Sequence, residues 1–375
     1  MGRTSIYTVM IICLGFVLKT HGKFASAHSE SFRYIGRFDF SNPQSPSFAH
    51  SGTHIEFLFK GTQLEIGLSN DVLPNIEDLN YYTVLKNGQK IATIKPSKIK
   101  AFFSVNIHTP DTFCRIQVIK RTESFCGIGV FHGVKYNEEG ALQRPPEKLR
   151  KIEWIGDSFL AGYGNMVAID PPPKDNPSTG FHAENEDAYQ TFGVITSRNL
   201  HADYSCIAMS GKGVYRNYDT TEEETVPKIY PFIYPDGGKY DFLFKPDLIV
   251  IKLGTNDFGA EMNQPPNMTD SSRFVSTYLK FLHDVINNNP TSKIVLALGG
   301  GISNSFPKGL NRLKRYRNWV QKVKIEAEQK YMNEFGFFEF KLMEPPYGED
   351  WHPTVNDQNK FAKEITPFLK KFMGW

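Results

Sequence analysis

The sequence predicts two domains: a β-sandwich of the jelly-roll type, followed by a three-layer α/β/α domain around a mostly parallel sheet. Length is the first reason, because 375 residues exceed what one hydrophobic core usually covers. The second is a change near residue 147, where short strand-like runs give way to apolar runs that alternate with helical periodicity. The third is a set of polar loop motifs that follow the later strands.

A leader is expected before these domains. Arg3 precedes an apolar run at residues 6–18, and the small residues 25–27, Ala-Ser-Ala, offer a cleavage site. The run is shorter than the roughly 20 residues that cross a bilayer as a helix. The alternative, an uncleaved interfacial helix, lacks a basic or amphipathic segment to hold it at a membrane. We therefore predict that residues 1–27 are a signal peptide and that the protein is secreted, with no membrane partner.

The sandwich is predicted over residues 28–137. Its short runs are rich in Phe, Ile, Val and Thr and are separated by Gly, Pro, Asn and Ser, which is typical of an all-β fold. An Asn-Gly pair at residues 87–88, between the runs 82–85 and 91–94, predicts a two-residue hairpin turn. Residues 138–148, which contain a glycine and a proline pair, are predicted to be the linker.

The α/β domain is predicted over residues 149–375. The expected strands are residues 152–155, 248–253, 294–298 and 337–342. The expected helices, with apolar residues three and four apart, are residues 185–200, 270–288, 310–331 and 356–372. Such alternation predicts a parallel sheet with helices on both faces and reactive loops at the carboxyl ends of its strands.

Charge argues against nucleic acid as a partner. The leader carries three basic residues and no acid, so the formal net charge falls from +3 to about zero without it. The densest basic stretch, residues 311–317, has the pattern of a solvated helix face. A protein that neutralises phosphates needs clustered lysine and arginine, which this chain does not offer.

Three cysteines lie outside the leader: Cys114, Cys126 and Cys206. An odd number in an oxidising compartment permits one bridge within the chain. Cys114 and Cys126 flank the turn-like residues 121–124, so a cross-strand disulfide and a pair of buried free thiols are both open interpretations. None of the three has surroundings that suggest catalysis.

A serine stands where the first strand of the α/β domain is expected to end. Ser158 closes the string Gly-Asp-Ser at residues 156–158, directly before an expected helix. A serine hydroxyl needs an adjacent base to act as a nucleophile, and its own amide at a helix start can donate to an oxyanion. Alone, the string is equally well explained as a turn that caps a helix.

Two further loops offer hydrogen-bond donors. Asn256 lies in the string Leu-Gly-Thr-Asn-Asp at residues 253–257, after a predicted strand, and Gly211 lies in residues 209–213, after the short apolar run 204–208. Turn chemistry explains either loop alone. Together with Ser158, they predict an oxyanion hole built from the Ser158 and Gly211 amides and the Asn256 side chain.

His352 is the expected base. It precedes the last predicted helix, with Asp350 two residues and Glu349 three residues earlier, and Pro353 follows it. A catalytic triad is defined by geometry rather than by the order of its members in the chain. A histidine in this C-terminal loop is therefore expected to reach Ser158.

These four blocks, in this order, resemble the SGNH (GDSL-like) hydrolase superfamily, and their fuller strings are similar to carbohydrate esterase family 2. The strings are Gly-Tyr-Gly-Asn at 162–165, Ser-Gly-Lys-Gly at 210–213, Asp-Trp-His-Pro at 350–353 and, in the first domain, Gly-Arg-Phe-Asp at 36–39. The resemblance covers nearly all of the mature chain. It implies a jelly roll before an SGNH domain, with Ser158 as nucleophile, Gly211 and Asn256 as oxyanion donors and His352 as general base.

The two family patterns differ in one respect, the position of the triad acid. The superfamily pattern places it at Glu349, whereas the esterase pattern places it at Asp350. We expect Asp350. Some members of the esterase family are thought to use a Ser–His dyad with a main-chain carbonyl, so Glu349 and a carbonyl stay open as alternatives.

The resemblance implies an enzyme that removes O-acetyl groups from plant cell-wall polysaccharides, such as acetylated xylan or mannan, through an acetyl-serine intermediate. It implies no metal or organic cofactor, and the sequence shows neither zinc-type ligand spacing nor a sign of an obligate protein partner. The residues themselves specify only an ester. They specify neither the sugar, the acetyl position nor the oligomeric state.

Trp351, Tyr163 and Tyr215 are expected sugar contacts because aromatic faces stack on pyranose rings. Aromatic residues are 14% of the chain, so chance proximity is the competing explanation. The sandwich is interpreted either as a carbohydrate-binding module or as one wall of the cleft. Two other functions compete. One is a lipid or thioester hydrolase, but residues 171–177, after the serine motif, are polar, whereas a lipase would be expected to carry an apolar lid there. The other is a non-catalytic sugar-binding protein.

Overall fold

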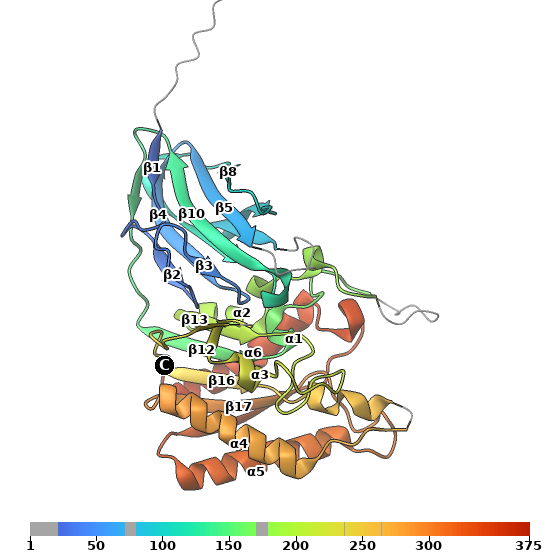
Figure 1. Ribbon diagram of the computed structural model, residues 1–375. Coiled ribbons are helices and arrows are strands. Elements are labelled where there is room, and N and C mark those ends of the chain that lie inside the picture. Colours follow the sequence, from blue (N-terminus) through green and yellow to red (C-terminus); the bar gives the residue numbers. More distant parts are fainter. Residues whose placement is uncertain (1–21, 72–79, 170–178, 236, 264) are drawn as a thin grey trace, which may run out of the picture.

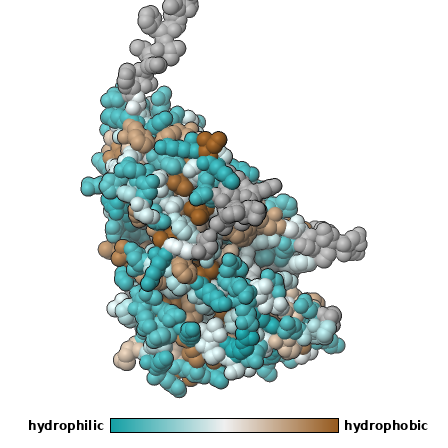
Figure 2. Space-filling model, viewed as in Figure 1, coloured by the Kyte–Doolittle hydropathy of each residue, from teal (hydrophilic) through white to brown (hydrophobic). Residues whose placement is uncertain are grey.

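The computed structural model describes residues 22–71, 80–169, 179–235, 237–263 and 265–375 (Figure 1). Most of the predicted leader and the polar segment 171–177 lie outside these ranges. In Figure 1 the sandwich lies above the α/β domain, next to the edge strand β13 (Ala202–Ala208). On the face shown in Figure 2, hydrophilic residues cover most of the surface, and hydrophobic ones form small separate groups.

The sandwich consists of two antiparallel sheets. One has the order β1 (Lys23–Ala25), β10 (Ile128–Tyr136), β5 (Leu64–Asp71) and β8 (Ala101–Val105), with β3 (Ser47–Phe48) also on β10. The other has the order β11 (Ala141–Gln143), β4 (His54–Gly61), β9 (Thr109–Lys120), β6 (Tyr82–Lys86) and β7 (Gln89–Ile94), with β2 (Arg33–Ile35) also on β4. Buried phenylalanines fill the space between them: the ring of Phe32 meets those of Phe57 and Phe131 edge to face.

The sandwich extends beyond the sequence-based boundaries at both ends. β1 lies within the expected leader and pairs with β10, and β11 lies within the expected linker and pairs with β4. Both strands are three residues long, too short for an alternating pattern to identify them. The predicted hairpin is present as β6 and β7, and its turn residues Asn87 and Gly88 have φ angles of 51° and 84°.

The α/β domain has a five-stranded parallel sheet in the order β13, β12 (Arg150–Gly156), β16 (Leu248–Lys252), β17 (Lys293–Gly299) and β18 (Phe335–Phe340). Residues of α4 (Ser271–Asn288) and α5 (Arg312–Lys330) share one core with side chains from one face of the sheet, together with α3 (Val226–Ile229). On the other face, α2 (Phe192–Asn199) and α6 (Val355–Met373) form a second core together with α1 (Ser158–Ala161). The predicted three-layer α/β/α class is confirmed.

Several elements differ in extent from the prediction. The helix expected over residues 185–200 begins only at Phe192, because two 3₁₀ turns, η2 (Ala183–Asn185) and η3 (Ala188–Gln190), precede it. Asp187 caps η3 by accepting the Tyr189 amide, and this local contact competes with a continuous helix. β18 begins two residues before the expected strand.

Cys114, Cys126 and Cys206 are buried free thiols, so the second of the two interpretations for Cys114 and Cys126 describes the structure. Within the described ranges, no helix has the length and apolarity needed to cross a bilayer.

Candidate active site

Ser158 follows the carboxyl end of β12, the strand between β13 and β16, and is the first residue of α1. Asp157 caps this short helix by accepting the Phe159 amide, and both oxygens of its carboxylate lie 3.2 Å from Nζ of Lys252. Lys252 is fully buried at the end of the neighbouring strand β16. A buried ion pair therefore ties the residue before Ser158 to the neighbouring strand.

His352 lies beside Ser158. Its Nε2 is 2.7 Å from Oγ of Ser158, and its Nδ1 is 2.9 Å from the main-chain oxygen of Glu349. A carbonyl oxygen can only accept a hydrogen bond, so Nδ1 carries the proton and Nε2 is left to accept the serine proton. Burial lowers the pKa of His352 below its ordinary value, which favours the neutral ring that a base requires.

The carboxylate of Glu349 braces the loop that holds His352. It accepts the His182 amide at 3.1 Å and the Asn185 side-chain amide at 2.7 Å, and it contacts Nδ1 of His182 at 2.7 Å. The loop also packs on Gly164, where an added Cβ would lie 2.3 Å from the Glu349 side chain at a φ of +54°. Only glycine fits there, so the Gly-Tyr-Gly-Asn string has a steric role in placing the histidine.

The structure differs from our expectation for Asp350. Its carboxylate accepts the Tyr163 hydroxyl at 2.7 Å and the amides of Thr179 and Gly180 at 2.8 and 3.3 Å, while the Glu349 carbonyl contacts Nδ1 of His352. Asp350 has a positive φ of 46°, which turns its side chain toward residues 179–180. Sequence spacing does not reveal this turn, because a left-handed residue changes where its neighbours point.

The two predicted donor loops follow β13 and β16, the strands on either side of β12, and they contact each other. Gly211 has a φ of +75°, and an added Cβ there would have no heavy atom within 4 Å, so one side of this residue is open. Nδ2 of Asn256 donates to the Lys212 carbonyl at 2.9 Å. An amide nitrogen carries two hydrogens, and this contact occupies one of them while joining the two loops.

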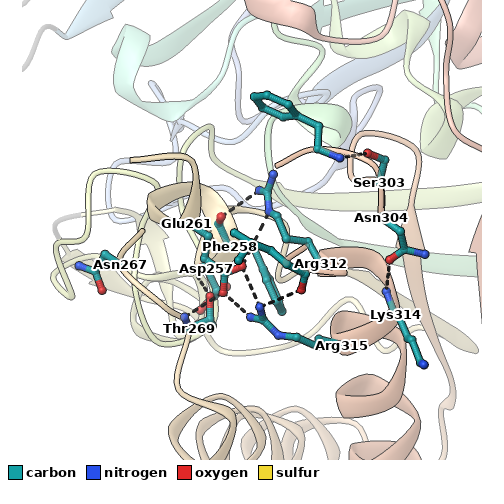
Figure 3. A network of polar contacts seen from close by, with 12 residues as sticks. Asp257, Phe258, Glu261, Asn267, Thr269, Ser303, Asn304, Arg312, Lys314 and Arg315 are labelled. Atoms are coloured by element: carbon teal, nitrogen blue, oxygen red, sulfur yellow. Dashed lines mark hydrogen bonds and ion pairs between the residues drawn. The ribbon is translucent and has the colours of Figure 1, made fainter. Parts of the chain in front are cut away.

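Asp257 fixes the two loops more firmly. It is fully buried, and its carboxylate accepts the amides of Val214, Tyr215 and Arg216 at 2.8, 2.9 and 3.3 Å. Burial raises the pKa of Asp257 to about 7, and the three amides oppose that rise. Figure 3 shows the polar layer behind it, in which Arg312 and Arg315 reach the carboxylate of Glu261.

The three expected aromatic contacts lie in different environments. The Tyr163 ring is 4.3 Å from the His352 ring, and Trp351 is 43% exposed beside it. Tyr215 is 7% exposed, and its hydroxyl accepts the Asp270 amide at the start of α4. Tyr163 and Trp351 therefore flank the catalytic pair, whereas Tyr215 packs into the core beneath the loops.

Sequence reasoning missed His182 and Asn185, which hold the Glu349 carboxylate. They are separated from it by 167 and 164 positions in the chain, and neither belongs to a motif. No pattern along the chain points to such a contact, because it depends on how the loops of different strands pack together.

Comparison with known proteins places both domains. Residues 34–146 match the model "Carbohydrate esterase 2 N-terminal", and residues 152–365 match the model "GDSL-like Lipase/Acylhydrolase". The first match ends at residue 146 and the second begins at residue 152.

Two curated relatives and one solved structure illustrate the similarity. Cellulase/esterase CelE of Acetivibrio thermocellus is 29% identical over 91% of this chain, which spans 39% of that protein's length. An acetylxylan esterase / glucomannan deacetylase of Cellvibrio japonicus is 27% identical over 89% of this chain and 88% of its own. The structure of a family two carbohydrate esterase from Clostridium thermocellum in complex with cellohexaose has a TM-score of 0.81 and 29% identity, covering 92% of this chain and 99% of that one.

Proposed function

Because the chain belongs to the GDSL-like lipase/acylhydrolase family, we propose that it is a serine esterase that removes O-acetyl groups from plant cell-wall polysaccharides such as acetylated xylan or mannan. The observation that carries the proposal is the 2.7 Å contact between Oγ of Ser158 and Nε2 of His352. The strands on either side of β12 end in the two loops that offer oxyanion donors, and acyl transfer needs such donors beside a nucleophile and its base.

In the proposed mechanism, Ser158 attacks the acetyl carbonyl while Nε2 of His352 takes its proton. The amides of Ser158 and Gly211 and the side chain of Asn256 donate to the oxyanion. The imidazolium then gives its proton to the leaving sugar hydroxyl, and water, activated by the same histidine, releases acetate from the acetyl-serine. The Glu349 carbonyl, and not Asp350, holds the imidazole in the required tautomer.

The substrate class is supported by the relatives and by the surroundings of the dyad. Two curated relatives are named acetylxylan esterase / glucomannan deacetylase, and a similar structure holds cellohexaose. Trp351 offers a partly exposed ring next to His352, where a sugar could stack. This surface favours a polysaccharide over the lipid or thioester alternative.

Secretion through the leader is part of the proposal. β1 pairs with β10, and Ala27 is 2% exposed, so cleavage after Ala27 would remove an edge strand of the sandwich. N-terminal sequencing of the secreted protein is the check. Retention of Lys23 in the mature chain would show that β1 is kept, and a start at residue 28 would show that it is not.

The proposed activity is tested by acetate release from acetylated xylan and from 4-nitrophenyl acetate. Ser158→Ala and His352→Ala should each lower kcat on the order of 10⁴-fold or more, because nucleophile and base act as a unit. A protein that binds xylan and releases no acetate from either substrate would favour the non-catalytic alternative. Faster turnover of long-chain than of acetyl esters would favour a lipid hydrolase.

A further inference from the structure

The bridging segment, residues 120–126 of the sandwich, reaches across to the α/β domain. Arg121 accepts the Ala188 amide with its carbonyl at 2.9 Å and donates from its guanidinium to the carbonyls of Glu184 and Glu186 at 2.9 and 3.1 Å. The sequence had singled out this segment as a turn between two cysteines. In the structure it is a docking element whose backbone and side chains meet the other domain.

Glu123 is the member of the bridging segment that contacts an active-site loop. It is fully buried, and its carboxylate accepts both the main-chain amide and the hydroxyl of Ser210, at 2.6 and 2.5 Å. Ser210 immediately precedes Gly211. A carboxylate of the sandwich thus holds the residue whose carbonyl forms one peptide unit with the Gly211 amide.

Gly211 is held from both sides. Glu123 fixes Ser210 before it, and Asn256 fixes the Lys212 carbonyl after it at 2.9 Å. The amide of Tyr218 donates to the carbonyl of Gly211 itself at 2.8 Å. With both neighbours bound, the direction of the Gly211 N–H is set without any side chain of its own.

A second buried acid, Glu186, stands behind Glu123. It accepts the Glu123 amide at 3.0 Å, and burial together with the neighbouring Glu123 charge raises its pKa well above the ordinary range. The pKa of Glu123 is raised by burial as well, but its two bonds from Ser210 oppose that rise, so the negative charge of the pair is favoured on Glu123. Glu123 is then left to accept from Ser210.

We propose that Glu123 of the sandwich is a positioning residue for the oxyanion hole: it orients the Gly211 amide through Ser210, so that both domains complete one catalytic site. The inference rests on the proposed esterase function. It assigns the sandwich a part in the chemistry in addition to any contact with sugar.

The test compares Glu123→Ala and Glu123→Gln in the full chain with a matched control, Glu56→Gln. Glu56 is also a buried sandwich carboxylate, 1% exposed, and it pairs with Arg33, which reaches Asp203 of the α/β domain. It contacts neither active-site loop. The readouts are kcat and KM per folded molecule on 4-nitrophenyl acetate, the thermal midpoint, and hydrogen–deuterium exchange of residues 209–213.

Glu123→Ala should lower kcat per folded molecule roughly 10- to 100-fold with little change in KM, because a donor is misplaced rather than deleted. In Glu123→Gln, the amide oxygen can still accept one hydrogen bond from Ser210, so kcat should fall by a smaller factor. Glu56→Gln should lower the thermal midpoint alone. Unchanged kcat per folded molecule in both Glu123 variants would overturn the proposal.

Hydrogen–deuterium exchange separates this proposal from the proposed function. If the intact protein proves to be no esterase, that function fails, and the Glu123 contact is judged by exchange. Residues 209–213 must then exchange faster in Glu123→Ala than in the intact protein and in Glu56→Gln. Equal exchange in all three would refute the positioning role.

Discussion

The two loops that flank Ser158 are held in different ways. The histidine loop, residues 348–352, is held from within the α/β domain, where the Glu349 carboxylate accepts from His182 and Asn185. The oxyanion loop, residues 209–213, is held partly by Glu123 of the sandwich. Glu123 contacts the oxyanion loop directly, whereas Arg121 binds the carbonyls of Glu184 and Glu186, in the segment that holds Glu349. The sandwich thus supports one loop by direct contact and the other through an intermediate segment.

Substitution of Asn256, which holds the oxyanion loop through the Lys212 carbonyl, is expected to have the largest effect on kcat. Asn256→Ala should lower kcat by about 100- to 1,000-fold, because it removes a proposed oxyanion donor and releases the Lys212 carbonyl. Asn256→Asp keeps the size of the side chain but turns the donor into an acceptor, and it should lower kcat by at least the same factor. Steady-state kinetics on an acetyl ester provides the measurement. A change in KM alone would place Asn256 in substrate binding instead.

A smaller effect is expected at Asp350, which tests how the histidine loop works. A triad acid would cost on the order of 10⁴ in kcat when removed. Asp350→Ala should cost no more than about tenfold, or roughly 1.4 kcal/mol, because the Glu349 carbonyl stays at Nδ1. Part of that loss would come through Tyr163, whose hydroxyl Asp350 accepts. Tyr163→Phe is the matched control, and a triad-sized loss at Asp350 would contradict the carbonyl dyad.

The smallest effect is a displacement of the pH profile. Burial lowers the pKa of His352, so the ring stays neutral to a lower pH than a free histidine does. A base is active when neutral, so kcat/KM should hold steady down to below pH 6.5 and fall as the pH drops through the lowered pKa. An acidic limb centred above pH 6.5 would indicate that a carboxylate stabilises the imidazolium after all.

Much of the fold followed from local patterns. The Asn-Gly hairpin turn, α4 and α5 were predicted within a few residues, because their signals are short-range and strong. The three-residue strands β1 and β11 were not, since so short a strand has no recognisable period. The candidate site shows the same division. Motifs singled out Ser158 and His352, which lie in contact, and Gly211 and Asn256 as candidate donors, whereas the residues that hold their loops come from distant parts of the chain.

The sequence by itself determined the two domains, the family resemblance and the residues that carry the proposed chemistry, because reactive side chains in loops after strands leave a readable order along the chain. The tertiary structure decided what orients them. The Asp350 carboxylate accepts from Tyr163 and Thr179, the Glu349 carbonyl contacts His352, and the packing of the sandwich brings Glu123 to Ser210, 87 positions further along the chain. Such contacts depend on the direction of a side chain and on the closeness of separate segments, neither of which spacing along a sequence encodes.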